Sequence, residues 1–244
     1  MLDWFEPIHD PGGVVSRTVL RLDQLAARRG VRLYPQTDFH GLKDVAAANR
    51  QHGSVLAPNV DADLSRLGDA NATWILGVDK DGQPATTQAG RYFDWSGTTL
   101  GAEMESFRFF YEHPVRHLTA DCFCRMPRPA ADQIVGAAFH TGTIWVRPDL
   151  RGPDEEGIIL SQLLGRMIRL IGIAHWWPDY LFSFSTRALR DRGVVKNFGW
   201  SHHDPGAEWK LPGEAVYEGG LSWMSREEML DWASAQPTRH AAAE

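Results

Sequence analysis

Residues Trp145 to Gly172 read WVRPDLRGPDEEGIILSQLLGRMIRLIG, and this stretch decides the fold. The apolar run at 144–146 ends at a proline, which is typical of a buried strand. The next residues, up to Gly157, include two prolines, two glycines and three consecutive acids, which indicate a loop and a helix start. From there apolar residues recur every three or four positions, so we predict one long amphipathic helix.

A loop that enters a helix in this way leaves backbone N–H groups free at the helix start. These groups can bind an anion, typically a phosphate. The alternative is an ordinary strand–helix unit without a ligand, since most such units bind nothing.

The segment that follows continues the alternation of strands and helices. Residues 180–185 (YLFSFS) predict a strand, 186–192 a short helix closed by Gly193, and 196–201 (KNFGWS) another strand. This order, together with the pattern V-x-P-x-x-R-G at 146–152, resembles the C-terminal half of the GNAT (N-acetyltransferase) superfamily. The resemblance covers residues 135–200 well, 72–95 loosely and the rest hardly at all.

The resemblance implies an α/β (mixed α+β) fold with a GNAT-like central mixed sheet flanked by helices and an enlarged N-terminal part. We expect a single domain over 1–244, with a helical N-terminal extension at 1–71 packed on a core at 72–233. The core would contain a central hairpin, since TWILGV at 73–78 and the strand from 83 to 95 flank the turn signal Asp-Lys-Asp-Gly. Near the C-terminus, Ser225 and Glu228 form a capping-box pattern that predicts a helix start.

Composition narrows the class of protein. The chain has 244 residues, 43% of them hydrophobic, and a net charge of −6. No apolar run approaches the ~20 residues of a membrane span, and the acidic, proline-interrupted N-terminus does not resemble a signal peptide, so we expect a cytoplasmic protein without a membrane partner. The 31 acids against 25 bases argue against a nucleic-acid partner. We interpret Arg28 and Arg29, like Arg187, Arg190 and Arg192, as parts of solvated helix faces, and Cys122 and Cys124 as buried thiols.

The resemblance also implies a co-substrate, acyl-coenzyme A, with acetyl-coenzyme A the first choice. In the family, the pyrophosphate binds the amides of a loop patterned R/Q-x-x-G-x-G/A, and the pantetheine lies between two parted parallel strands, here 144–146 and 181–185. The implied cofactor-binding residues are Trp145, Val146, Arg147, Arg151, Gly152, Gly157, Ile158 and Ser183.

The loop departs from the family pattern. Its spacing is R-x5-G, Pro153 lacks an N–H donor, and the carboxylates of 154–156 would repel a pyrophosphate. Either the loop reshapes around Arg147, Arg151 and Gly157, or the chain no longer binds coenzyme A there.

Candidates for acid–base chemistry are few. His140 precedes the binding strand where family members often carry a base, although a hydrogen-bonded histidine at a strand end is the alternative. The family's tyrosine acid has no counterpart in 186–192. The remaining proton donors are Tyr180, which is poorly placed at a strand start, and Ser183 or Ser185 acting through water. For both serines the alternative is an ordinary hydroxyl on a strand without a catalytic role.

We therefore predict an N-acyltransferase that transfers an acyl group directly to an unidentified amine in a ternary complex. Its acceptor would be a small molecule in a pocket lined by Trp95, Phe107 and Phe110, unless these aromatics are core. The alternatives are a fold relative that has lost coenzyme A and binds another ligand or partner, and a catalyst of different chemistry at His202, His203 and Asp204. Tandem histidines point to opposite faces of a strand and no complete ligand set is visible, so no metal is expected. Association into a homodimer is left open.

Overall fold

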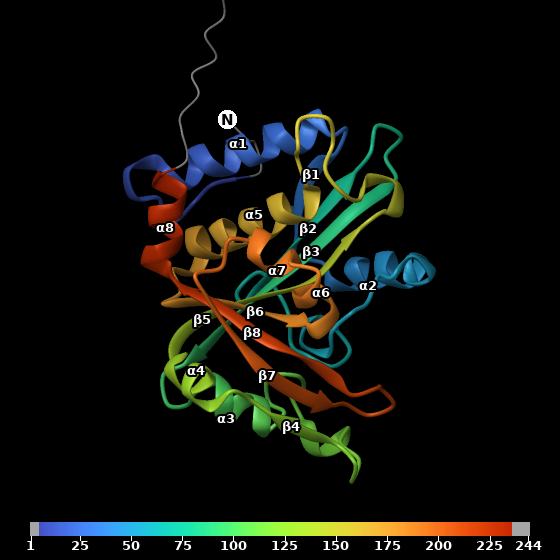
Figure 1. Cartoon of the computed structure of the whole chain (residues 1–244), viewed down its shortest axis with the longest axis vertical. Coiled ribbons are helices and arrows are strands. Elements are labelled where there is room, and N and C mark those ends of the chain that lie inside the picture. Colours follow the sequence, from blue (N-terminus) through green and yellow to red (C-terminus); the bar gives the residue numbers. More distant parts are fainter. Residues whose placement is uncertain (1–4, 236–244) are drawn as a thin grey trace, which may run out of the picture.

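The computed structural model describes residues 5–235, so the two ends of the predicted 1–244 domain lie outside the described residues. The strands are β1 (Arg32–Gln36), β2 (Ala72–Val78), β3 (Pro84–Trp95), β4 (Phe123–Arg125), β5 (Gly136–Val146), β6 (Tyr180–Thr186), β7 (His202–Lys210) and β8 (Tyr217–Ser225). The helices are α1 (Val14–Arg28), α2 (Phe39–Ala48), α3 (Leu100–Glu105), α4 (Arg128–Gln133), α5 (Leu160–Trp176), α6 (Arg187–Asp191), α7 (Val194–Asn197) and α8 (Arg226–Ser234) (Figure 1).

All strands of the described residues join in one eight-stranded sheet with the order β1-β2-β3-β5-β6-β8-β7-β4. Within this part of the chain, β5 and β6 form the single parallel pair, and each other pairing is antiparallel. A parallel pair needs a crossover, and the long helix α5 supplies it. The predicted mixed α/β architecture, a central mixed sheet flanked by helices, is confirmed.

Alternation along the strands divides the core into two sides. Phe139 and Leu181 pack with α1, α5 and α8 on one face, whereas Ala138 and Phe182 pack with α3 and α4 on the other. Figure 1 shows these two sets of helices on opposite sides of the sheet. Helix α2 covers β2 and β3 on that second face. Helix α5 lies so close to β5 that a Cβ on Gly172 would come within 2.5 Å of the Phe139 ring. The sheet therefore separates an α5 side from an α3/α4 side.

Several local predictions are confirmed. The Asp-Lys-Asp-Gly turn joins β2 to β3, and Asp79 Oδ1 accepts hydrogen bonds from two backbone N–H groups of that turn. Ser225 and Glu228 form the complete capping box at the start of α8. The long helix begins at Leu160 rather than near Gly157, because the preceding residues fold into a tight loop.

Two strand predictions are wrong in part or whole. Residues 196–201 hold the end of α7 and a turn instead of a strand, because the buried Arg169 guanidinium bonds the carbonyls of Phe198 and Gly199. The sequence of residues 118–126 (LTADCFCRM) also predicts a strand, but within it only Phe123–Arg125 pairs with a neighbour, β7. In both cases tertiary contacts outweigh local propensity.

Residues 5–71 contribute the strand β1 and the helices α1 and α2 to the layers of the fold. Strand β1 is hydrogen-bonded to β2 at the edge of the sheet, and α1 packs on α5. None of the helices in the described residues is both long and apolar enough to cross a membrane.

Candidate functional site

The parallel strands β5 and β6 are paired over a short distance and then separate. Their register contains three pairs, and the last joins His140 to Phe182. Beyond that point β5 continues along β3 to Val146, while β6 continues along β8 to Thr186. The sheet is therefore open between these two strands, as the resemblance implied.

A β-bulge lies on β5 at the opening. Thr143 and Ile144 together face Gln88, since the register with β3 passes from Gly142 opposite Ala89 to Trp145 opposite Thr87. Thr143 has a φ of 51°, which is a costly left-handed conformation for a β-branched residue. The Gln88 side-chain N–H donates to the Gly142 carbonyl at 3.2 Å. A bulge bends the strand that carries it, and this one lies just beyond the last residue of β5 that pairs with β6.

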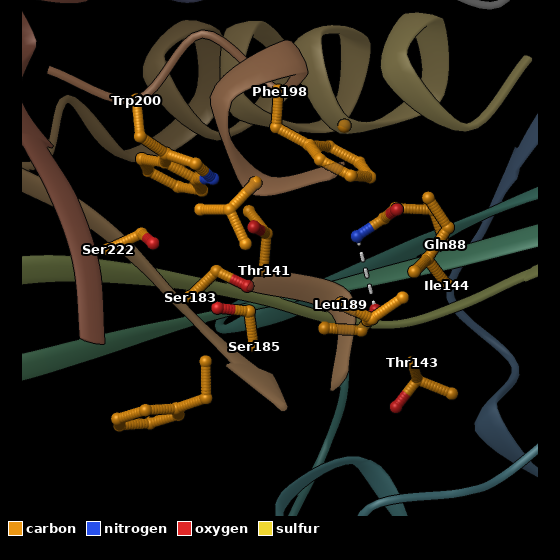
Figure 2. Close-up of a pocket in the computed structure, with 14 residues that line it drawn as sticks. Gln88, Thr141, Thr143, Ile144, Ser183, Ser185, Leu189, Phe198, Trp200 and Ser222 are labelled. Carbon is orange, nitrogen blue, oxygen red and sulfur yellow. Dashed lines mark hydrogen bonds between the residues drawn. The ribbon is translucent and has the colours of Figure 1, made fainter. Parts of the chain in front are cut away.

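A cavity of about 100 Å³, here called the interstrand cavity, occupies the opening (Figure 2). Its polar wall comes from β5 and β6 with Gln88 of β3 and Ser222 of β8, and its apolar wall from α6, α7 and the turn after α7. The lining residues are Gln88, Thr141, Gly142, Thr143, Ile144, Gly165, Ser183, Phe184, Ser185, Leu189, Val195, Phe198, Trp200 and Ser222.

The interstrand cavity contains hydrogen-bonding groups that the protein leaves unused. Within the described residues, Gln88 Oε1, Thr143 Oγ1 and Ser185 Oγ are buried and have no partner. A buried polar atom without a hydrogen bond typically costs 1–3 kcal/mol. Their grouping at one opening indicates a site for a ligand that carries both donors and acceptors.

The loop between β5 and α5 is closed by its own acidic side chain. Asp154 Oδ1 accepts hydrogen bonds from the N–H groups of Glu156, at 3.0 Å, and Ile158, at 2.7 Å. The N–H of Gly157 donates to the Asp154 carbonyl. A carboxylate thus occupies amides that a phosphate would otherwise bind, although no side chain caps α5 itself.

Arg29 fastens this loop to helix α1. Its guanidinium donates to the carbonyls of Leu150, Gly152 and Ile158, and it lies 3.8 Å from Asp154 Oδ2. Its side chain is only 9% exposed, so the interpretation of Arg29 as a solvated residue is wrong. Sequence spacing could not reveal these contacts, which join α1 to a loop more than a hundred residues away.

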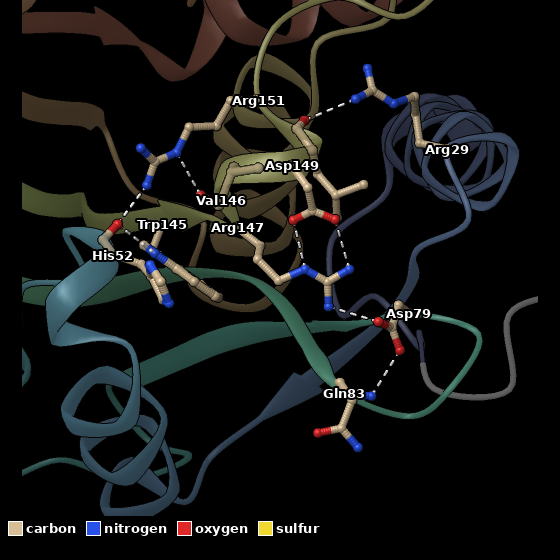
Figure 3. Close-up of polar contacts among 10 residues, drawn as sticks. Arg29, His52, Asp79, Gln83, Trp145, Val146, Arg147, Asp149 and Arg151 are labelled. Carbon is tan, nitrogen blue, oxygen red and sulfur yellow. Dashed lines mark hydrogen bonds and ion pairs between the residues drawn. The ribbon is translucent and has the colours of Figure 1, made fainter.

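Both predicted phosphate-binding arginines hold parts of the protein together. Arg147 pairs with Asp79 at 2.7 Å and with Asp149 at 2.8 Å (Figure 3). Arg151 donates to the carbonyls of Val146, at 2.8 Å, and His52, at 2.6 Å. Their guanidinium groups link the end of β5 to the β2–β3 turn and to the segment after α2.

The remaining predicted cofactor residues divide between the loop and the cavity. Trp145 and Val146 are buried, and the Trp145 indole N–H donates to the His52 carbonyl. Gly152 and Gly157 take left-handed conformations that glycine adopts without strain. Ser183 lines the interstrand cavity together with Ser185, a predicted proton donor. Tyr180 begins β6 in the paired region, outside the cavity lining.

His140 lies on the α3/α4 side of β5 and is 4% exposed. Its Nδ1 is 3.0 Å from Asn59 Nδ2, so it accepts from that amide. Aromatic rings of Phe109, Phe182 and Phe184 surround it. Burial, followed by repulsion from Arg91, lowers the pKa of His140 to about 3, which makes it a weak base. His140 is not among the cavity-lining residues, and its catalytic role stays a prediction.

The predicted acceptor residues Trp95, Phe107 and Phe110 are buried in the core between the sheet and α3/α4. Their role in substrate binding stays a prediction. Both cysteines are free and half-buried, and burial raises the pKa of Cys124 to about 12.

The tandem histidines occupy opposite faces of β7. His202 stacks on Trp223 and pairs with Glu228 at 3.0 Å, whereas His203 Nδ1 is 2.9 Å from Ser222 Oγ. In the part of the chain that the structure describes, no three His, Cys, Asp or Glu side chains form a group that could hold a metal ion.

Sequence reasoning missed most of the cavity. Gln88, Thr143, Phe198, Trp200 and Ser222 come from four separate segments and carry no shared motif. The one local signal was Gly142, which interrupts an otherwise regular strand and marks the position before the bulge.

Comparisons with known proteins give matches in structure alone. No family model matches the chain, and no curated protein sequence does. Among solved structures, Arabidopsis thaliana NAA60 in complex with acetyl-CoA aligns at 11% identity over 81% of this chain and 99% of that chain, with a TM-score of 0.43. AAC(6')-Ib in complex with paromomycin and acetyl-CoA aligns at 11% identity over 86% of this chain and 99% of that chain, with a TM-score of 0.41.

Proposed function

We propose that the chain is an acyl-coenzyme A-dependent N-acyltransferase that acts on a small amine. The observation that carries the proposal is the opening between β5 and β6, where two parallel strands part after His140 and Phe182 around a cavity. Parallel strands inside a sheet normally stay hydrogen-bonded along their length, and an opening leaves backbone groups for a ligand to bind.

The lining of the interstrand cavity suits the pantetheine part of the co-substrate. A pantetheine chain alternates amides with short alkyl segments. Gln88 Oε1 would accept from an amide N–H, and the hydroxyls of Thr143 and Ser185 would donate to amide carbonyls, which would satisfy the unpartnered atoms. Leu189 and Phe198 offer apolar contact to the alkyl segments. When bound, the thioester would supply the acyl group, and the residues named here would orient it.

The phosphates would bind at helices α6 and α7 rather than at the β5–α5 loop. In that loop the N–H groups of Glu156 and Ile158 donate to the Asp154 side chain, and three consecutive residues are acidic. By contrast, residues 187–196 (RALRDRGVVK) hold four bases and one acid, and this segment also supplies Leu189 and Val195 to the cavity lining. Within residues 5–235, Arg192 and Lys196 pair with no carboxylate, so their charge is available to an anion.

Calorimetric titration with acetyl-coenzyme A tests the cavity. Ser185→Phe places a ring in the interstrand cavity and should weaken binding at least roughly tenfold, because the filled volume excludes the ligand. Ser234→Phe adds the same ring on the exposed end of α8 and should bind as the wild type does. Circular dichroism checks that both variants fold. A wild type that binds no acyl-coenzyme A at millimolar ligand would end the proposal.

Turnover is measured as release of free thiol from acetyl-coenzyme A in the presence of amines. Thiol release that requires an amine supports acyl transfer, whereas equal release without amine indicates hydrolysis and contradicts the proposal. The double variant Arg192→Glu and Lys196→Glu should lose activity with acetyl-coenzyme A but keep it with the phosphate-free thioester S-acetyl-N-acetylcysteamine. Arg66→Glu, an exposed change outside the cavity lining, is the matched control.

One observation favours a second function: the backbone N–H groups of Glu156 and Ile158 already donate to the Asp154 side chain. A chain that had given up coenzyme A would serve as a ligand-binding or interaction module. The calorimetric titration separates the two, because such a module would leave acetyl-coenzyme A unbound.

A further inference from the structure

Three polar side chains form a row across adjacent strands on the α5 side of the sheet. Ser183 of β6 lies opposite Ser222 of β8, and Ser222 lies opposite His203 of β7. Both serines line the interstrand cavity, and Figure 2 shows their side chains beside one another. The row therefore leads from the cavity across two strands to an imidazole.

The contact between His203 and Ser222 is a hydrogen bond of ordinary length. Nδ1 of His203 is 2.9 Å from Oγ of Ser222. Ser222 is 1% exposed, whereas His203 is exposed to solvent. Gly220 leaves space for the ring, since a Cβ at that position would come within 2.7 Å of His203 Cε1. One end of the pair thus reaches the cavity and the other end reaches water.

His203 is uncharged at neutral pH. Burial and the nearby Arg190 of α6 lower its pKa below the usual 6.5, and Asp204 of β7 opposes them weakly. Strand β8 contributes Gly220 and Ser222, neither of which titrates. A neutral imidazole can accept the Ser222 hydroxyl proton at Nδ1.

His203 differs from His140 in its exposure, its hydrogen-bond partner and the side of the sheet on which it lies. His140 is enclosed by aromatic rings, bonds Asn59, and lies on the opposite side of β5. His140 is buried, with 4% of its surface exposed, whereas His203 is exposed and can give up a proton to solvent.

We propose that Ser222 and His203 form a proton relay that deprotonates the amine acceptor in the interstrand cavity; this rests on the proposed acyltransferase function. An N–H bond of the acceptor ammonium breaks as an O–H bond forms at Ser222. The original Ser222 proton passes to Nδ1 of His203 in the same step. The neutral amine keeps its lone pair for attack on the acyl carbon, and the imidazolium releases the proton to water. His203 acts through Ser222 and is a positioning residue in that sense.

The neighbouring histidine provides a matched control. His203→Gln and Ser222→Ala should each lower kcat for an alkyl amine by about 100-fold at neutral pH. His203 lies outside the cavity lining, so His203→Gln should leave the acetyl-coenzyme A affinity unchanged. His202→Gln, one residue away on the other face, should keep wild-type kcat. The wild-type rate should fall as pH drops below the His203 pKa, and this fall should vanish in His203→Gln.

Acceptor chemistry separates a proton-transfer role from a structural one. An aromatic amine is already neutral at neutral pH and needs no deprotonation before attack. His203→Gln should therefore lose little activity with an aromatic amine while it loses most with an alkyl amine. Equal losses with both amines, or equal kcat for His203→Gln and His202→Gln, would overturn the relay.

Proton NMR titration of the imidazoles gives a readout independent of turnover. Ser222→Ala should shift the His203 pKa; an unchanged His203 pKa would contradict the coupling. The two proposals fail in different ways. A wild type without acyl-coenzyme A binding removes both, whereas an active wild type whose His203→Gln variant is equally active removes the relay alone.

Discussion

Acidification should destabilise the protein in part through His140, and substitution of His140 should remove that part of the loss. The imidazole is buried and neutral, and burial lowers its pKa to about 3. In the unfolded chain the same group has the ordinary value of 6.5. The unfolded state therefore binds a proton below about pH 6.5 that the folded state refuses, so folding stability falls as the pH decreases.

The size of the effect follows from the two pKa values. Between the unfolded and folded values, each pH unit costs ~1.4 kcal/mol for one group. From about pH 7 to about pH 5 the His140 contribution is ~2 kcal/mol, since only the part below pH 6.5 counts. His175 and His203 also have lowered pKa values and add to the total loss.

Urea denaturation at the two pH values measures the effect by difference. In His140→Leu the side chain cannot titrate, so the loss on acidification should be ~2 kcal/mol smaller than in the wild type, while the losses from His175 and His203 remain. His113→Leu, at an exposed position, controls for the loss of a histidine as such. If His140→Leu and the wild type lose the same stability on acidification, His140 is not buried as a neutral group and the reasoning is refuted.

Three substitutions test other parts of the structure by urea denaturation. Ser225→Ala removes the capping box of α8 and should cost ~1 kcal/mol; an unchanged midpoint would contradict the cap. Gly172→Ala pushes a methyl group against Phe139, 2.5 Å away, and should cost ~1–3 kcal/mol. Thr143→Gly relieves the left-handed strain at the bulge, so the free energy of unfolding should rise by ~1 kcal/mol. The same change should weaken cofactor binding. A lower free energy of unfolding would show that the bulge is unstrained.

The cavity was predicted only in outline. Its two strands could be located from the resemblance, and Ser183 and Ser185 lie in it. The loop that was expected to bind phosphate is instead closed by Asp154 and Arg29. Arg29 follows α1, so its contact with the loop depends on how α1 packs on α5.

The amino-acid sequence by itself determined the elements whose hydrogen bonds or periodicity lie within a few residues. The apolar stripe of α5, the Asp-Lys-Asp-Gly hairpin and the Ser225–Glu228 capping box are of this kind. Tertiary structure alone decided where β5 and β6 part, how Thr143 bulges, and that His203 meets Ser222. These features depend on strand register and helix packing between distant segments, and a register shift of one residue would turn each of these side chains to the other face of the sheet.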